Sequence, residues 1–245
     1  MTKLSRIFAI AIIATFLAAI PLTVSGKEPD IVKVVNVLRV DDNYAKPPGS
    51  PGGGKGKTEG YAFILNGGYT WESAVNLVID PTCTQFDGDF NYAIGLATAE
   101  WDSHTGASLF GTVSVSTLTL FAETDRPDGE NELLFADLGD SGIIAQTTTW
   151  FSRIGKRIVD FDIVFNIRFS WGNCGETSET ALGSTTLMDT RNIATHEIGH
   201  GLNLADLYAT QWSEQTMYGY ANYGETKKRT LDSGDIAGIQ ALYGA

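Results

Sequence analysis

Two histidines four residues apart constrain this chain more than any other feature. The segment runs His196-Glu-Ile-Gly-His200, and together with His104 these are the only histidines in 245 residues. On an α-helix, positions i and i+4 lie about 40° apart on one face, so both imidazoles can point toward a single metal ion. Glu197 lies one step around the helix, where it reaches a water on that ion. The pattern therefore predicts a helix that carries a metal site, with His196 and His200 as ligands.

This spacing is the zinc-peptidase motif, in which the glutamate, here Glu197, is the general base. A catalytic zinc takes three protein ligands and keeps a fourth position for water. No histidine follows His200, so the third ligand is expected to be a carboxylate. The near candidates are Asp206, Glu214 and Glu225.

The composition excludes several classes of protein. The chain has 29 acidic and 17 basic residues, a formal net charge of −12, which argues against a nucleic-acid partner. Hydrophobic residues make up 43% and charged residues 19%, so general disorder is excluded and a sizeable core is expected.

The N-terminus has the order of a secretory signal peptide. Lys3 and Arg6 precede a nearly continuous apolar stretch, Ile7–Ile20, and Pro21 then breaks it. Residues 1–26 are therefore expected to be cleaved, which makes the protein secreted. The alternative is an uncleaved anchor that tethers the protein to the outer face of a membrane, because residues 7–24 just reach the length of a span.

A short segment and a linker separate this leader from the main domain. The β-branched stretch Ile31–Val40 is typical of a strand. Lys46–Lys57 is dense in Pro and Gly and is expected to be a linker. Residues 27–60 are thus interpreted as a propeptide remnant or as a strand added to the main sheet, and residues 61–245 as the main domain.

The main domain mixes strands and helices, which predicts an α+β fold with a twisted mixed sheet backed by helices. Strands are expected at residues 77–79, 112–121, 143–149 and 158–169, and helices at 90–103, 190–202 and 233–243.

The chain has two cysteines, Cys83 and Cys174. An even count in an exported protein predicts a disulfide between them. The alternative is a pair of free, buried thiols.

The residues that follow His200 resemble the long metzincin motif, in which a Gly stands at the position of Asn203 and a His or Asp at that of Asp206. The resemblance implies that the chain turns in a left-handed conformation at Asn203 and brings Asp206 to the metal. Asn is the non-Gly residue that best tolerates this conformation. Residues 216–219 resemble the Met-turn of the same family, which implies that Met217 forms the floor of the metal site.

The resemblance extends to the matrixin branch of the metzincins over residues 61–244. The segment Gly142-Ile143-Ile144-Ala145-Gln146 resembles its edge strand, to which substrate binds as an added strand. Gln146 stands where this branch usually has a His for a second, structural zinc, so one catalytic zinc is implied. Residues 162–166 resemble the following strand and residues 234–243 the C-terminal helix. Residues 27–60 lack the cysteine that keeps animal members latent, and the chain looks like the secreted matrixin-like peptidases of prokaryotes.

These features together predict a secreted zinc endopeptidase that acts on protein or peptide substrates, with Glu197 as base. Two alternatives stay open: a catalytically silent metal-binding or adhesion module on the same fold, and a peptidase with Glu214 or Glu225 as third ligand. The resemblance and the acidic composition also suggest calcium, with no ligands assigned. His104 is expected to have a surface role, and Tyr218 or Tyr220 is a candidate for steadying an oxyanion. No membrane partner is expected unless the leader is retained.

Overall fold

The computed structural model describes residues 30–41, 60–122, 125–140, 142–174 and 186–245. The leader, residues 1–26, and the linker, residues 46–57, lie outside these ranges, so the structure does not address either interpretation. Within the described ranges, no helix combines the length and the apolar character needed to cross a bilayer.

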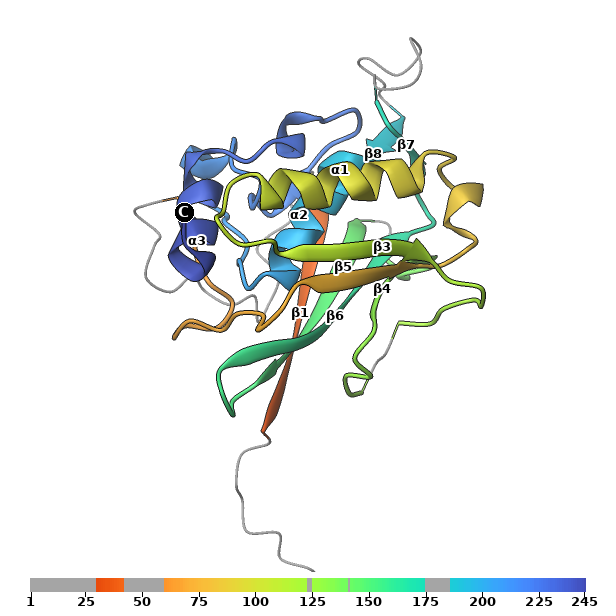
Figure 1. Ribbon diagram of the computed structural model, residues 1–245. Helices are drawn as coiled ribbons and strands as arrows, with labels where there is room; N and C mark the ends of the chain where they lie inside the picture. The colour runs from red at the N-terminus through yellow and green to blue at the C-terminus, as the bar shows by residue number, and fades with distance from the viewer. Residues whose placement is uncertain (1–29, 42–59, 123–124, 141, 175–185) are drawn as a thin grey trace, which may run out of the picture.

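A seven-stranded mixed sheet forms the centre of the molecule, in the order β3-β2-β4-β6-β5-β1-β9 (Figure 1). Strands β3, β2, β4 and β6 are parallel to one another, whereas β5 is antiparallel to both β6 and β1. A separate parallel pair joins β7 to β8. The strands are β1 (Ile31–Val40), β2 (Val75–Ile79), β3 (Phe110–Val115), β4 (Asn131–Ala136), β5 (Ile143–Ser152), β6 (Arg157–Asn166), β7 (Ser170–Gly172), β8 (Leu187–Asp189) and β9 (Tyr220–Ala221).

Three α-helices accompany the sheet: α1 (Phe90–Asp102), α2 (Thr190–Gly201) and α3 (Ser233–Tyr243). Figure 1 shows α1 and α2 together on one side of the sheet, with α3 near the C-terminus. Three short 3₁₀ turns complete the structure, at Cys83–Gln85, Thr210–Trp212 and Lys227–Arg229. The predicted α+β class, with a mixed sheet backed by helices, is confirmed.

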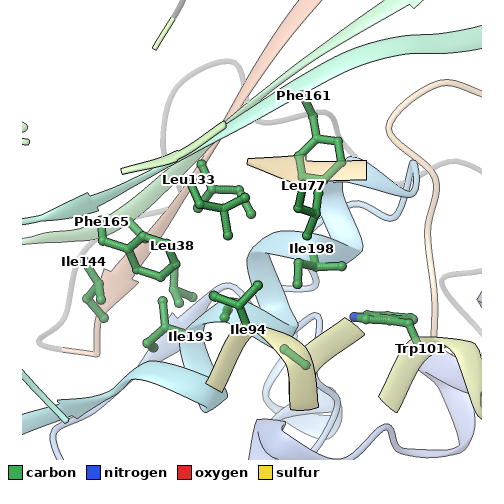
Figure 2. Packing of buried hydrophobic residues seen from close by; sticks show 14 of the residues in the cluster. Leu38, Leu77, Ile94, Trp101, Leu133, Ile144, Phe161, Phe165, Ile193 and Ile198 are labelled. Carbon is green, nitrogen blue, oxygen red and sulfur yellow. The ribbon is translucent and has the colours of Figure 1, made fainter. Parts of the chain in front are cut away.

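The main core lies between the sheet and helices α1 and α2 (Figure 2). Ile193 and Ile198 of α2 belong to it, as does the fully buried Trp101 of α1, whose indole N–H donates to the Thr195 carbonyl at 2.9 Å. Gly201 allows α2 to approach the sheet, because a Cβ there would lie 2.8 Å from the Phe161 ring. This packing fixes the helix that carries the histidine pair.

Helices follow the predicted ranges more closely than strands do. The strand expected at residues 112–121 is too long, because β3 ends at Val115 and the chain beyond it exposes Leu118 and Phe121. The alternation of Thr and Leu continues past Val115, but the neighbouring β2 already ends at Ile79, whose carbonyl accepts the Ser116 N–H. Strand β4 was not predicted.

The expectation that residues 142–146 form an open sheet edge is wrong. Strand β5 pairs with β6 on one side and with β1 on the other, in a register that runs from Ile31 opposite Ser152 to Arg39 opposite Ile143. An edge strand leaves its backbone groups unpaired, and the β-branched residues of β1 supply the missing partners. The N-terminal segment is thus part of the sheet.

The expected disulfide is also absent: Cys83 and Cys174, both described, are free and buried. Each thiol donates a separate hydrogen bond: Cys83 Sγ donates to the Leu133 carbonyl at 3.6 Å, and Cys174 Sγ donates to the Gly172 carbonyl at 4.0 Å. Burial raises the pKa of Cys83 to about 12 and that of Cys174 to about 11. Both are therefore protonated, poorly reactive thiols at neutral pH.

Candidate metal centre

Helix α2 is held firmly at its start and along its length. Asp189 caps it, with its side chain accepting the Asn192 N–H at 2.7 Å, and an ion pair to Arg229 holds Asp189 in turn. Strand β5 lies along the helix, where the Thr149 hydroxyl donates to the His200 carbonyl at 3.3 Å. The last two turns of α2 therefore have a fixed position over the sheet.

The two histidines of α2 are fully buried and converge through their Nε2 atoms, which lie 3.1 Å apart. Each ring is oriented by its other nitrogen: His196 Nδ1 lies 2.7 Å from the Thr216 carbonyl, and His200 Nδ1 lies 2.8 Å from the Leu204 carbonyl. A carbonyl accepts only, so each Nδ1 carries the proton and each Nε2 presents a lone pair. This is how metal-binding histidines are usually fixed.

A left-handed turn follows the helix at Asn203, whose φ is +77°. The side-chain amide of Asn203 binds the neighbouring segment, accepting the Leu65 N–H at 2.9 Å and donating to the carbonyls of Leu65 and Tyr69 at 3.0 and 3.1 Å. The turn is closed by the Leu204 N–H, which donates to the Gly199 carbonyl at 2.9 Å. The chain thus reverses beneath the end of α2.

Three residues later, Asp206 meets the histidine pair. Its Oδ1 lies 3.3 Å from His196 Nε2 and 3.5 Å from His200 Nε2, while its Oδ2 accepts the Tyr208 hydroxyl at 2.9 Å. In the described part of the chain, His196, His200 and Asp206 form the one group of three or more such side chains whose ligand atoms all lie within 4.8 Å of one another. Two imidazole nitrogens and a carboxylate oxygen suit a zinc ion.

The other two carboxylates considered as third ligand lie elsewhere. Glu214 is exposed, with Lys227 3.3 Å away. Glu225 pairs with the buried Lys228 at 3.5 Å and accepts from the Asn192 amide at 3.3 Å. Neither belongs to the group of convergent ligand atoms.

Met217 packs against α2 at Gly199, the residue before His200. It is 1% exposed, and a Cβ placed on Gly199 would lie 2.4 Å from its Sδ and 2.8 Å from the Trp101 ring, so any larger residue there would require these side chains to move. Asp235 of α3 holds this turn by accepting the N–H groups of Thr216 and Met217, at 2.6 and 3.1 Å. The position of the Thr216 carbonyl, and with it the His196 ring, therefore depends on α3.

Glu197 is also fully buried, on the side of α2 that faces β5. The Thr147 hydroxyl donates to its Oε2, and its Oε1 finds no hydrogen-bond partner among the described residues. Burial raises the pKa of Glu197 to about 7, although the nearby His200 and the Thr147 hydroxyl oppose this shift. A carboxyl group with one free oxygen and a pKa near neutrality can take up and release a proton.

The pKa values of the three ligand residues are shifted in different directions. Burial lowers the pKa of His196 to about 4. Burial would raise the pKa of Asp206, but the two histidines outweigh it and hold that pKa well below its usual range. The carboxylate of Asp206 in turn raises the pKa of His200 against the effect of burial. An ionised Asp206 and a neutral His196 are the states in which both groups ligate a metal.

The three remaining candidate residues, His104, Tyr218 and Tyr220, have the following neighbours. His104 lies just beyond α1, 3.1 Å from Glu100, in keeping with a surface role. Tyr218 packs over the ammonium group of Lys228, and the Tyr220 ring lies 5.6 Å from those of Tyr208 and Tyr218. The contacts of Thr147, Tyr208 and Asp235 at this site are not predicted by local sequence patterns, although Thr147 directly follows the strand motif and Asp235 lies inside the C-terminal helix motif.

A mixed sheet of this topology, with two convergent histidines on the helix packed against it and Asp206 just after that helix, defines a metzincin-like catalytic domain. The chain belongs to the matrixin family, whose model matches residues 82–244, more than half of its length. Membership makes the protein a metallopeptidase of a zinc-dependent family. A search of the curated proteins finds no match to the chain.

Proposed function

We propose that this protein is a secreted zinc-dependent endopeptidase in which His196 Nε2, His200 Nε2 and Asp206 Oδ1 hold one zinc ion and Glu197 is the general base. The convergence of these three buried ligand atoms carries the proposal. Support comes from the Nδ1 contacts of both rings, which leave each Nε2 lone pair free. Asp206 Oδ1 is likewise buried without a hydrogen-bond donor in the described part of the chain.

A bound zinc ion supplies a water of lowered pKa and polarises the scissile carbonyl. The role of the protein's own residues is to hold that water and to move its proton. Thr147 fixes one oxygen of Glu197 and leaves the other free, so Glu197 is placed to accept the proton and to return it to the leaving amine. Full burial of the carboxyl excludes bulk water as a competing donor.

The substrate is proposed to be a protein or peptide, the class of molecule on which a peptidase family acts. Secretion follows from the leader at residues 1–26.

The geometry favours this function over the two alternatives. Glu214 and Glu225 are committed to lysines and lie outside the ligand group, so a centre that uses either is disfavoured. A catalytically silent module would have no use for a buried carboxyl at position 197, since an unpaired buried carboxylate oxygen costs free energy.

Digestion of labelled casein by the purified protein, with and without a chelator, tests the proposal. The parent should cleave, the chelator should stop cleavage, and added zinc should restore it. Glu197→Ala should keep zinc and lose activity by several orders of magnitude, as expected for loss of a general base. If Glu197→Ala cleaves as fast as the parent, Glu197 is not the base.

A further inference from the structure

Asp206 presents its two carboxylate oxygens to different partners. Oδ1 lies 3.3 Å from His196 Nε2 and 3.5 Å from His200 Nε2, and it has no hydrogen-bond partner in the described part of the chain. Oδ2 instead accepts the Tyr208 hydroxyl at 2.9 Å. One oxygen is therefore left for a metal ion, and the other is taken by a phenol two residues later in the chain.

The surroundings of Tyr208 hold its ring in place. Backbone bonds fix the chain on its N-terminal side, because the Leu207 N–H donates to the Met217 carbonyl at 2.8 Å and the Gly219 N–H donates to the Leu207 carbonyl at 2.9 Å. The Tyr220 ring packs edge-on against that of Tyr208, with the two centroids 5.6 Å apart. Gly219 leaves room for the ring, since a Cβ there would lie 2.6 Å from Tyr208 Cε1. The direction of the hydroxyl is thus set by packing as well as by its hydrogen bond.

A carboxylate as third ligand differs from a histidine in the number of atoms it can offer a metal. A neutral imidazole offers one nitrogen with a free lone pair, whereas an ionised carboxylate offers two oxygens, which can bind a metal singly or together. A catalytic zinc takes three protein ligands and keeps a fourth position for water. If both oxygens of Asp206 bound the ion, the second oxygen would compete with that water.

We propose that Tyr208 is a positioning residue that holds Asp206 as a one-oxygen zinc ligand and so keeps the fourth position open. The proposal rests on the proposed function, because it takes His196, His200 and Asp206 as the ligands. The hydroxyl of Tyr208 binds the oxygen that does not face the histidines, and it acts only through Asp206. Carboxylates that ligate a metal are commonly fixed by such outer hydrogen bonds.

Tyr208→Phe tests the proposal, because it removes the hydroxyl and keeps the ring. Zinc affinity of the full chain, measured by titration against a competing chelator, should fall about 10–100-fold, as for other outer partners of metal ligands. The matched control is Tyr223→Phe, which removes the hydroxyl of an exposed tyrosine that packs against Phe169. The control should stay within about threefold of the parent.

The same change in an Asp206→Ala background separates positioning from general support of the turn. Without the carboxylate the hydroxyl has no ligand to orient, so Tyr208→Phe should then change the remaining zinc affinity by no more than about threefold. A hydroxyl that only supports the turn would cost the same affinity with and without Asp206. Equal losses in the two backgrounds would overturn the proposal.

Cobalt(II) loaded in place of zinc provides a spectroscopic readout of the coordination number. Four-coordinate cobalt absorbs visible light more strongly than cobalt with additional ligands, because its geometry lacks a centre of symmetry. Release of Asp206 Oδ2 should let it bind the ion, so cobalt-loaded Tyr208→Phe should absorb more weakly than the parent and Tyr223→Phe. Unchanged zinc affinity or an unchanged cobalt spectrum in Tyr208→Phe would overturn the role of Tyr208 alone. If the parent binds no zinc, or Asp206→Ala binds it as the parent does, the ligand set of the proposed function is wrong, and the role of Tyr208 is wrong with it.

Discussion

Asp235 in the C-terminal helix holds the backbone of Met217, whose side chain packs against the histidine-bearing helix. Its two carboxylate oxygens accept the backbone N–H groups of Thr216 and Met217, and Thr216 in turn offers its carbonyl to His196. The geometry of the centre therefore depends on a residue 35 positions beyond the second histidine.

Replacing Asp235 with Ala should weaken both the fold and the metal site. Each buried N–H left without an acceptor costs about 1–3 kcal/mol, so we expect a loss of about 2–4 kcal/mol in the free energy of unfolding. Zinc affinity should fall about 10–100-fold, as for other partners that orient metal ligands. Denaturant unfolding and zinc titration measure the two effects. Ser233→Ala, on the exposed first turn of the same helix, is the control; equal behaviour of the two variants would contradict the role of Asp235.

Asn203 should be replaceable by Gly at a lower cost than by Ala. Both changes lose the three hydrogen bonds of the amide to Leu65 and Tyr69. Only Ala also carries the strain of a Cβ at φ +77°, about 1 kcal/mol or more. Thermal unfolding should therefore rank the parent above Asn203→Gly and Asn203→Gly above Asn203→Ala. The reverse order of the two variants would show that the backbone conformation does not matter here.

Asp206→Ala should lower zinc affinity by at least about 100-fold, more than the loss of an outer partner. Glu225→Gln, which keeps an acceptor for the buried Lys228, and Glu214→Ala should leave zinc affinity within threefold of the parent. Titration with zinc against a competing chelator measures all three. If Asp206→Ala still binds zinc and a change at Glu214 or Glu225 abolishes zinc binding, the alternative ligand set is correct.

Glu132→Gln should stabilise the protein at alkaline pH. Glu132 is buried on β4, its Oε2 has no partner in the described part of the chain, and burial together with Asp162 raises its pKa to about 10. A carboxyl that holds its proton more tightly when folded favours folding below its unfolded pKa, and this contribution is lost as pH rises toward the folded value.

The variant should therefore match the parent near pH 4 and exceed it by about 2 kcal/mol or more at pH 8. Urea unfolding at the two pH values measures this difference. Glu130→Gln, two residues earlier and exposed, should show no such dependence. A parent whose stability is unchanged from pH 4 to pH 8 would contradict the raised pKa of Glu132.

The parts of the centre that depend on local spacing could be predicted from the sequence. The interval between His196 and His200 requires only helical geometry, and the turn at Asn203 requires only a residue that accepts positive φ. The position of Asp206 follows from both. Helix ranges were predicted closely for the same reason, since a helix is stabilised by residues three and four apart.

The parts that depend on distant pairing could not be predicted in this way. Nothing near Gly142–Gln146 indicates that β1 covers that edge, because the partner lies more than 100 residues earlier. The bonds from Thr147 to Glu197 and from Asp235 to Met217 likewise join separate elements. Strand β3 was overestimated because the length of a strand is set by its neighbour, here β2.

The place of β1 in the sheet has a consequence for the order of folding. Strand β1 leaves the ribosome before both of its partners, because β5 follows more than 100 residues later and β9 about 180 residues later. Contacts of such long sequence separation form slowly. Until then Ile31–Val40 is an unpaired β-branched segment with few charges, the type of sequence most exposed to aggregation and to chaperone binding.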